Sequence, residues 1–262
     1  MDPIARPQPK PEVFQFGPWT VTSQKSHILK SEGEKREKFE SDLAPLPQFP
    51  EMIFADNVIR VQHEGKFGIE FNALDALRLV DAKNDLMKVA VAAEWQEARA
   101  ESDIKEVINP FDWTFSTNYK GTTLGDIKIT ETTERIDMEK LKVREKIHFF
   151  SDLVLYEDEL ADNGCSLLNV KIRVMPSSFF ILMRFYMRVD GVLIRTNDTR
   201  VYHQAGSNYM LREYTSKESK MSDLKVEGHL LTDTNLIGEH LKLTHEQFEK
   251  LEFPINNASN AT

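Results

Sequence analysis

The feature that most constrains the fold is a long apolar run, Phe179 to Val189, which ends at the pair Asp190-Gly191. A continuous apolar run of this length can be a strand or a buried helix. The Asp-Gly pair favours the strand, because a two-residue type I′ hairpin loop needs a positive φ at both positions. The stretch from Val192 to Thr196 is then predicted to return antiparallel to the first strand.

The same pattern continues on the N-terminal side of this hairpin. Leu153 to Tyr156 is rich in strand formers, and Asn163-Gly164 is a second hairpin signal ahead of the run Leu167 to Val174. A break at Pro176 separates that run from the apolar one. The sequence therefore predicts an α+β fold, a single domain in which helices flank antiparallel β-sheets with a central meander.

The predicted register of the hairpin gathers arginines on one face. If Asp190 and Gly191 are the two loop residues, Tyr186 pairs with Arg195 and Arg188 pairs with Leu193. One face of the first strand is then wholly apolar. The other face carries Phe180, Leu182, Arg184, Tyr186 and Arg188, and Arg195 of the returning strand joins it, which places three arginines around one tyrosine. Arginine forks bind carboxylates, so this face suits an acidic peptide with an aromatic side chain. The equally supported alternative is an internal network with Glu157, Asp158 and Glu159.

Helices are predicted outside the meander from capping signals. Asn72 with Asp75 marks one helix start, and Asp137 marks a short helix that ends at Lys142. Two further helices are predicted over 92–100 and, from a capping box at Thr244 and Gln247, in the segment that follows. The charged stretch 30–42 is either a solvated helix or a linker loop.

Composition limits the partners and the compartment. The 262 residues carry a formal net charge of −9 with a pI near 5.4, which disfavours nucleic acid as a partner. No apolar run is long enough to span a bilayer, no secretory signal is visible, and Cys165 is the single cysteine. We expect a chain that is located in the cytoplasm, with the nucleus as a second location, and that is a monomer when free. Residues 1–13 and 256–262 are predicted to be flexible tails around one domain, 14–255.

Catalytic motifs are not found. The sequence contains no His-Glu-x-x-His helix, no Gly-rich phosphate loop and no Gly-x-Ser-x-Gly elbow. Glu157, Asp158, Glu159 and Asp162 form the one dense carboxylate cluster, which does not match a calcium loop. We expect no enzyme, no cofactor and no metal; a cation-dependent hydrolase that uses this cluster is the less favoured alternative.

Several long motifs resemble a known family. They are Phe16-Gly17-Pro18-Trp19, Gly68-Ile69-Glu70-Phe71-Asn72-Ala73, Asn109-Pro110-Phe111-Asp112-Trp113-Thr114, Tyr119-Lys120-Gly121-Thr122, Tyr156-Glu157-Asp158-Glu159-Leu160, Val170-Lys171-Ile172-Arg173-Val174-Met175-Pro176-Ser177-Ser178-Phe179-Phe180 and Asn197-Asp198-Thr199-Arg200. In this order they resemble the TOR signalling pathway regulator-like family (TIPRL type), from about Phe14 to Leu224.

The resemblance implies a non-enzymatic protein that binds the catalytic subunits of protein phosphatases 2A, 4 and 6. Such proteins restrain phosphatase activity, assist its biogenesis and recycling, and are linked to TOR signalling. By position, the family's phosphatase contacts fall on Asp75, Ile136 and Thr196, and the last stands where the family has methionine. A cleft on the sheet receives the phosphatase C-terminal tail; the predicted tail-binding residues are Arg173, Arg184, Tyr186, Arg188, Arg195 and Arg200.

Two of these contacts have alternative interpretations. Ile136 is the only large apolar residue between Ile129 and Met138, so it is either an exposed hot spot or an anchor that folds inward. The resemblance favours the exposed position. Asp75, in the first turn of a predicted helix, is either a phosphatase contact or a partner of the helix cap.

Overall fold

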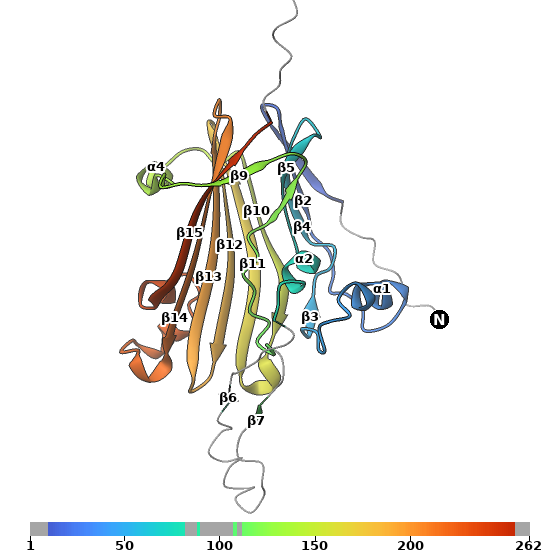
Figure 1. The fold of residues 1–262 in the computed structure, drawn as a ribbon, viewed down its shortest axis with the longest axis vertical. Helices are drawn as coiled ribbons and strands as arrows, with labels where there is room; N and C mark the ends of the chain where they lie inside the picture. Colours follow the sequence, from blue (N-terminus) through green and yellow to red (C-terminus); the bar gives the residue numbers. More distant parts are fainter. Residues whose placement is uncertain (1–9, 82–87, 90–106, 109–111, 255–262) are drawn as a thin grey trace, which may run out of the picture.

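Two β-sheets make up the molecule. The structure is a computed structural model that describes residues 10–81, 88–89, 107–108 and 112–254. Within these residues a five-stranded sheet stands beside an eight-stranded one, and a separate strand pair is the third sheet (Figure 1). The strands pair antiparallel throughout the described part of the chain, which confirms the predicted α+β fold with antiparallel sheets.

The elements have the following bounds. The smaller sheet contains, in spatial order, β1 (Glu12–Phe16), β2 (Trp19–Gln24), β4 (Val58–His63), β5 (Phe67–Asn72) and β8 (Thr122–Leu124). The larger sheet contains β3 (Met52–Ile53), β10 (Phe149–Asp158), β11 (Gly164–Val174), β12 (Ser178–Val189), β13 (Leu193–Gln204), β14 (Tyr209–Lys220), β15 (Lys242–Glu252) and β9 (Lys128–Glu131). The separate pair is β6 (Lys88–Val89) with β7 (Val107–Ile108). The α-helices are α1 (Glu34–Asp42), α2 (Ala73–Leu77) and α4 (Met138–Lys142), and the 3-10 turns are η1 (Leu160–Asp162), η2 (Met221–Asp223), η3 (Gly228–Leu231) and η4 (Ile237–Glu239).

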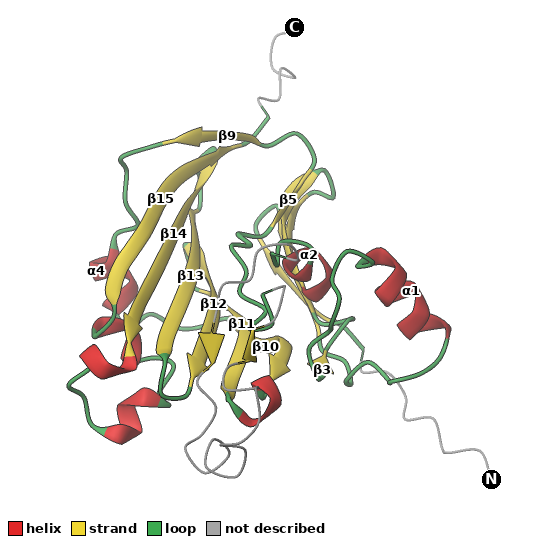
Figure 2. Cartoon of the chain, turned by 60° about the horizontal axis from the view of Figure 1, so that its bottom comes forward, coloured by secondary structure: helices red, strands yellow, loops and turns green. Residues whose placement is uncertain are grey.

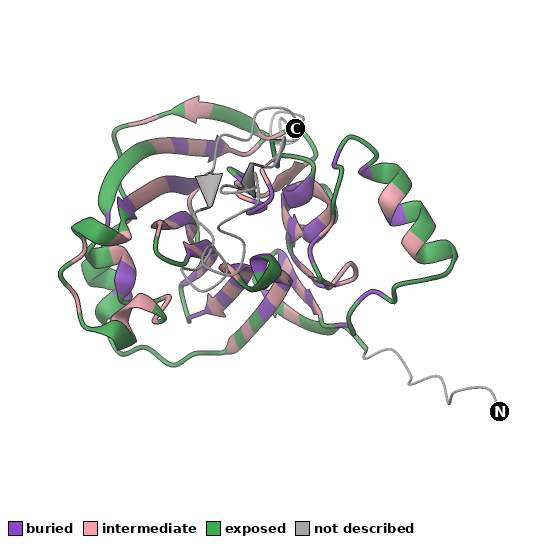
Figure 3. Cartoon of the chain, turned by 90° about the horizontal axis from the view of Figure 1, so that it is seen from below, coloured by how far each residue is buried: buried purple, intermediate pink, exposed green. Residues whose placement is uncertain are grey.

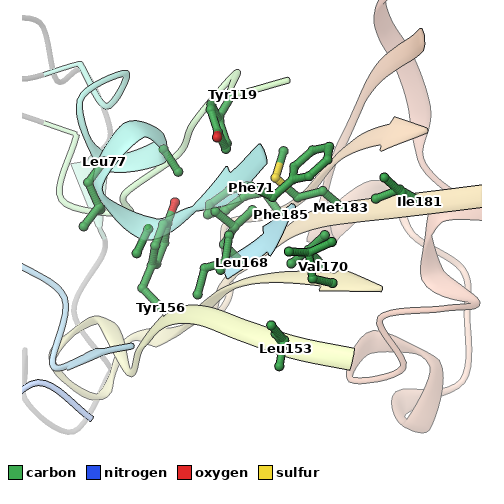
Figure 4. Close-up of a cluster of buried hydrophobic side chains, with 14 of the residues drawn as sticks. Phe71, Leu77, Tyr119, Leu153, Tyr156, Leu168, Val170, Ile181, Met183 and Phe185 are labelled. Atoms are coloured by element: carbon green, nitrogen blue, oxygen red, sulfur yellow. The ribbon is translucent and has the colours of Figure 1, made fainter. Parts of the chain in front are cut away.

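The hydrophobic core fills the space between the two sheets. The predicted apolar face of β12 supplies its centre, and none of these side chains is more than 2% exposed: Phe179, Ile181, Met183, Phe185, Met187 and Val189. Figure 4 shows Phe185 and Leu168 of the larger sheet beside Phe71 of the smaller sheet. The strand alternation of β12 therefore fixes which face of the larger sheet turns toward the smaller one.

The hairpin between β12 and β13 has a three-residue loop. Val189 pairs with Leu193, and the Val192 N–H donates to the Val189 carbonyl at 3.0 Å. Gly191 takes the positive φ, +72°, in the middle of the loop. The predicted two-residue loop is therefore wrong by one residue.

This difference changes the pairing of the whole hairpin. Tyr186 lies opposite Thr196, and Arg188 lies opposite Ile194, so the predicted pairs of Tyr186 with Arg195 and of Arg188 with Leu193 are wrong. Successive side chains of a strand point to opposite faces. The shift therefore moves Arg195 to the inner face, which is the face turned toward the smaller sheet.

Two predicted helix starts are confirmed. The Asn72 side chain accepts a hydrogen bond from the Asp75 N–H and begins α2. The Asp137 side chain accepts hydrogen bonds from the N–H groups of Glu139 and Lys140 and begins α4. In each case the capping oxygen satisfies amides that the first helical turn leaves without partners.

The remaining local predictions concern the charged stretch 30–42 and two further helices. The charged stretch 30–42 contains α1, which is exposed almost all round and buries Phe39 (Figure 3). The predicted helix after Thr244 is wrong, because this segment is β15 and pairs with β14 along most of its length. The predicted helix over 92–100 lies outside the described residues. None of the helices within the described residues is long and apolar enough to cross a membrane.

Two segments cover the outer face of the larger sheet, which is the face turned away from the smaller sheet. In Figure 2, α4 and the 3-10 turns after β14 lie on this side of β13, β14 and β15. Residues 136–147, which include α4, cover one end of the face. Residues 221–241, named here the C-terminal cover, lie over the other end.

Strand β9 joins the two halves of the molecule. It follows β8 of the smaller sheet after a short turn, but it pairs with β15 at the edge of the larger sheet. Thr130 of β9 and Glu252 of β15, whose side chains share a hydrogen bond, are 122 residues apart in the chain. The larger sheet is therefore completed by strands from distant parts of the sequence.

Candidate functional site: the outer face of the larger sheet

The outer face carries most of the residues that the sequence singled out. Arg173 lies on β11, Arg184, Tyr186 and Arg188 lie on β12, and Arg200 lies on β13. Their positions in the register place all five on this face. Arg184 and Arg188 flank Tyr186 as predicted, but Arg195 lies on the other face of the sheet.

The C-terminal cover occupies the region of Arg184 and Tyr186. The Arg184 guanidinium donates to both carboxylate oxygens of Asp198, each at 2.7 Å, and to the Thr234 carbonyl at 2.5 Å. The Tyr186 hydroxyl donates to the Leu231 carbonyl at 2.5 Å, and burial raises the pKa of this tyrosine to about 12. Both side chains therefore have their polar groups bound within the chain.

Three further arginines differ in position. Arg188 lies beside Tyr186 and pairs with Asp190 at 2.6 Å. Among the described residues, Arg200 makes only a long contact with Asp198, at 3.4 Å. Arg195 lies on the inner face, where it pairs with Glu218 and donates to the Ser116 hydroxyl. The prediction that Arg184, Arg188 and Arg195 converge around Tyr186 is therefore wrong, for the reason of register given above.

The carboxylate cluster does not balance these arginines. Asp158 is buried, and its two oxygens accept the N–H groups of Glu51 and Leu160. Burial raises the pKa of its carboxyl group. Across residues 10–81 and 112–254, no ion pair joins an arginine to Glu157, Asp158 or Glu159, so the predicted internal network is also wrong. The described residues contain no group of three His, Cys, Asp or Glu side chains placed to hold a metal ion.

Ile136 is an inward-facing anchor. Its side chain is 4% exposed and packs with Leu141, Met175 and Leu211. Its N–H donates to a carboxylate oxygen of Glu213 at 2.7 Å. The prediction of an exposed hot spot is therefore wrong, because the neighbouring outer-face side chains give this isolated apolar residue a place to be buried.

Thr196 and Asp75 belong to different elements, β13 of the larger sheet and α2 beside the smaller one. Thr196 is 3% exposed on the outer face, next to Gly238 of the C-terminal cover. Asp75 opens α2, where its carboxylate accepts hydrogen bonds from Asn72 and Thr122 and pairs with Arg78. Burial alone would raise the pKa of Asp75, but these hydrogen bonds and the Arg78 charge lower it. The cap interpretation of Asp75 therefore accounts for its contacts within the chain.

Sequence reasoning missed two buried carboxylates of the outer face. Asp198 holds Arg184 and contacts Arg200, and Glu213 holds the backbone at Ile136. Both are less than a tenth exposed. The signal that could have found them is the alternation of β13 and β14, which places both carboxylates on the same face as the arginines once the register is known.

Comparisons with known proteins identify the family. The family described as "TIP41-like family" matches residues 52–225, about two thirds of the chain. The chain belongs to the TIP41-like family. This confirms the resemblance found in the motifs. The match ends at the start of the C-terminal cover.

Individual relatives extend the similarity over nearly the whole chain. A TIP41-like protein of Homo sapiens is 56% identical over 246 residues, which cover 92% of this chain and 89% of the relative. A TIP41-like protein of Caenorhabditis elegans is 41% identical over 92% of this chain and 90% of the relative. The type 2A phosphatase activator TIP41 of Saccharomyces cerevisiae is 35% identical over 90% of this chain and 73% of the relative.

Proposed function

We propose that this chain is a non-catalytic regulator that binds the catalytic subunits of type 2A, 4 and 6 protein phosphatases. The observation that carries the proposal is its similarity, over 90% or more of its length, to two yeast proteins named type 2A phosphatase activators. A regulator of this kind acts through its surface, so the proposal needs a surface that a partner can reach.

The uncovered strip of the outer face supplies that surface. Between the two covers, β12 and β13 present Leu182 and Arg200, which pair directly across the strands and are both partly exposed. The side chain of Arg200 is 28% exposed, and among the described residues its one polar contact is the 3.4 Å one with Asp198. An acidic tail with an apolar side chain could bind there through Arg200 and Leu182. Of the residues predicted to bind the phosphatase tail, we therefore propose that Arg200 makes the main contact.

The three predicted phosphatase contacts take different parts in this proposal. Asp75, with a side chain 25% exposed, can be touched directly. Ile136 and Thr196 are buried, so we propose that they act by holding the segments on either side of the strip in place. A substitution at either position would then weaken phosphatase binding by moving the walls of the strip rather than by removing a contact.

The direction of regulation is open to a direct measurement. The family resemblance implies restraint of the phosphatase, whereas the yeast relatives carry the name activator. A protein that holds the catalytic subunit during biogenesis would inhibit the bound enzyme and still raise the amount of active enzyme later. We propose this combined action, with the immediate effect being inhibition.

The test is calorimetry with the purified catalytic subunits of phosphatases 2A, 4 and 6, together with turnover of a phosphopeptide substrate. We expect binding at micromolar concentrations or tighter and lower turnover in the complex. Arg200→Glu should weaken binding by about 1.5–3 kcal/mol if its hydrogen bonds are charge-assisted. The matched control is Lys38→Glu, an exposed residue of α1. Absence of binding to all three subunits by the folded wild-type chain would refute the proposal.

A further inference from the structure

A basic cavity, separate from the uncovered strip, lies at the end of the outer face that α4 covers. It has a volume of about 590 Å³ and lies between residues 140–147 and the ends of β11, β12 and β13. Its charged lining consists of Lys140, Lys142, Arg144, Arg173 and Glu145, which we name the basic pocket. Four cations against one carboxylate give the pocket a local charge of +3, in a chain whose net charge is −9.

Within the described residues, one of these four cations is paired with a carboxylate. Glu139 pairs with Lys142, and Asp137 accepts the N–H groups that begin α4. Lys140 and Arg144 are exposed, and neither forms an ion pair with any residue of the described chain. A concave site lined by one sign of charge focuses the field and attracts ions of the opposite sign. The basic pocket therefore suits an anionic ligand.

Arg173 provides a preorganised donor at the base of the pocket. Its guanidinium lies over the Phe180 ring at 5.5 Å, and its Nη2 donates to the Leu141 carbonyl at 3.0 Å. The Nε–H of Arg173 is buried and has no hydrogen-bond partner in the described part of the molecule. An unpaired buried donor costs stability, so a ligand oxygen that reaches this region would recover part of that loss.

The rest of the lining distinguishes a phosphoryl group from a simple carboxylate. Ser177, Ser178 and Tyr202 also line the pocket, and the Tyr202 hydroxyl donates to the Gln204 side chain. A phosphate monoester has three strong acceptor oxygens and a charge near −2, so it can bind guanidinium, ammonium and hydroxyl donors from several directions at once. A carboxylate has two oxygens and a single charge, and it leaves more of these donors unmatched.

Two exposed aliphatic residues indicate that the phosphoryl group is part of a peptide. Val143 and Ile147 line the same cavity and are 61% and 51% exposed. Apolar side chains beside a cluster of cations would contact residues that flank a phosphorylated position.

We propose that the basic pocket binds a phosphorylated segment of a partner protein, with Lys140, Arg144 and Arg173 contacting the phosphoryl group and Val143 and Ile147 contacting the flanking residues. The proposal does not depend on the identity of the phosphatase partner. It concerns a cavity separate from the uncovered strip. Through this cavity the chain would bind a partner protein in a way that depends on phosphorylation of that partner.

The test is fluorescence polarisation with the full chain and an oriented pool of labelled decapeptides that have a fixed central phosphoserine. Pools with serine and with glutamate at that position are the comparison. We expect the phosphorylated pool to bind at least about tenfold more tightly than the serine pool or the glutamate pool. Added salt should weaken binding of the phosphorylated pool, because partly exposed charge pairs are screened. Equal binding of the three pools, or no binding of any, overturns the proposal.

Matched variants locate the binding. Lys140→Glu/Arg144→Glu should lower affinity for the phosphorylated pool by about tenfold or more. The control Lys220→Glu/Lys225→Glu changes two exposed lysines elsewhere and lowers the net charge equally, from −9 to −13, because two cations become two anions in each variant. Equal losses in the two variants would show that only overall charge matters and would overturn the assignment to the pocket.

Two further measurements distinguish a phosphoryl site from a general cationic patch and from a membrane surface. Arg173→Lys keeps the charge but removes the Nε–H, so it should weaken binding of the phosphorylated pool more than binding of the glutamate pool. The loss of the Leu141 hydrogen bond affects the fold equally in both measurements. An identical effect on both pools overturns the role of Arg173 as a phosphoryl ligand. Vesicles that contain phosphatidylserine are the second probe, and binding to them that competes with the phosphorylated pool and depends on Lys140 and Arg144 would assign the pocket to membranes instead.

Discussion

The buried imidazole of His203 should make the stability of the fold fall in mild acid. His203 is 2% exposed, and its Nε2 accepts the indole N–H of Trp19 at 3.1 Å. Its Nδ1 lies 3.0 Å from the Tyr209 carbonyl, which fixes the neutral tautomer with the proton on Nδ1. Burial lowers the pKa of His203 from 6.5 to about 4, against the opposing effect of the Tyr209 carbonyl.

The sign and size of the effect follow from this shift. Above pH 6.5 the imidazole is neutral in both the folded and the unfolded chain, so its contribution to stability is fully present there. Between pH 6.5 and about 4 the unfolded chain binds a proton that the folded chain does not, and the free energy of unfolding falls as the pH is lowered. The shift corresponds to a loss of about 3 kcal/mol over that interval.

The assay is denaturant unfolding at a series of pH values from 7 to 4, which we apply to the wild type and to His203→Gln. The variant lacks the titrating group, so its free energy of unfolding should fall less steeply over the same interval. His27→Gln, which removes an exposed imidazole, is the control and should keep the wild-type slope. The same slope in His203→Gln and in the wild type would refute the reasoning, because the titration would then belong to other groups.

Three substitutions test the packing that surrounds the candidate surface. Ile136→Asp should destabilise the fold by about 3 kcal/mol and lower the melting temperature, since it places a charge in an apolar cluster. Glu249→Gln should lower the free energy of unfolding by about 3 kcal/mol, measured with a chemical denaturant. Its partner Arg212 lies 2.7 Å away with a side chain only 4% exposed, and it would lose its counter-charge. Gly164→Ala should also cost about 3 kcal/mol by thermal unfolding, because a Cβ there would clash with the Arg188 carbonyl.

Each of these substitutions has a control at a more open position. Met138→Asp and Glu246→Gln change exposed residues of α4 and β15, and both should leave the melting temperature nearly unchanged. Gly206→Ala introduces a Cβ at another glycine with a positive φ, and no atom lies within 4 Å of it. Only the cost of holding an alanine at a positive φ should then lower the stability. Equal losses in a variant and in its control would contradict the packing argument for that site.

The meander was predictable because its signals are local. The apolar run of β12, the turn residues after it and the caps of α2 and α4 each depend on a few neighbouring residues. The register was not predictable to the last residue, because an Asp-Gly pair fits both a two-residue and a three-residue loop. One extra loop residue was enough to move Arg195 to the opposite face of the sheet.

The other wrong predictions have tertiary causes. The segment after Thr244 carries a capping-box pattern, but its pairing with β14 outweighs that local preference. Ile136 looked exposed in a polar stretch, and only the packed positions of Met175 and Leu211 make a buried site for it. The C-terminal cover could not be foreseen as the partner of Arg184 and Tyr186, because its contacts to them are mostly backbone carbonyls that no sequence pattern reveals.

The pairing of β9 with β15 has a consequence for synthesis on the ribosome. Strands β10 to β14 follow one another in the chain, so each can pair with its predecessor soon after it emerges. Strand β9 must wait for β15, which is the last strand in the described part of the chain. Until then the edge of β9 has no partner in the larger sheet, and an unpaired edge is where wrong associations begin. We therefore infer that chains stalled before β15 depend most on chaperones, even though most of the meander has already been made.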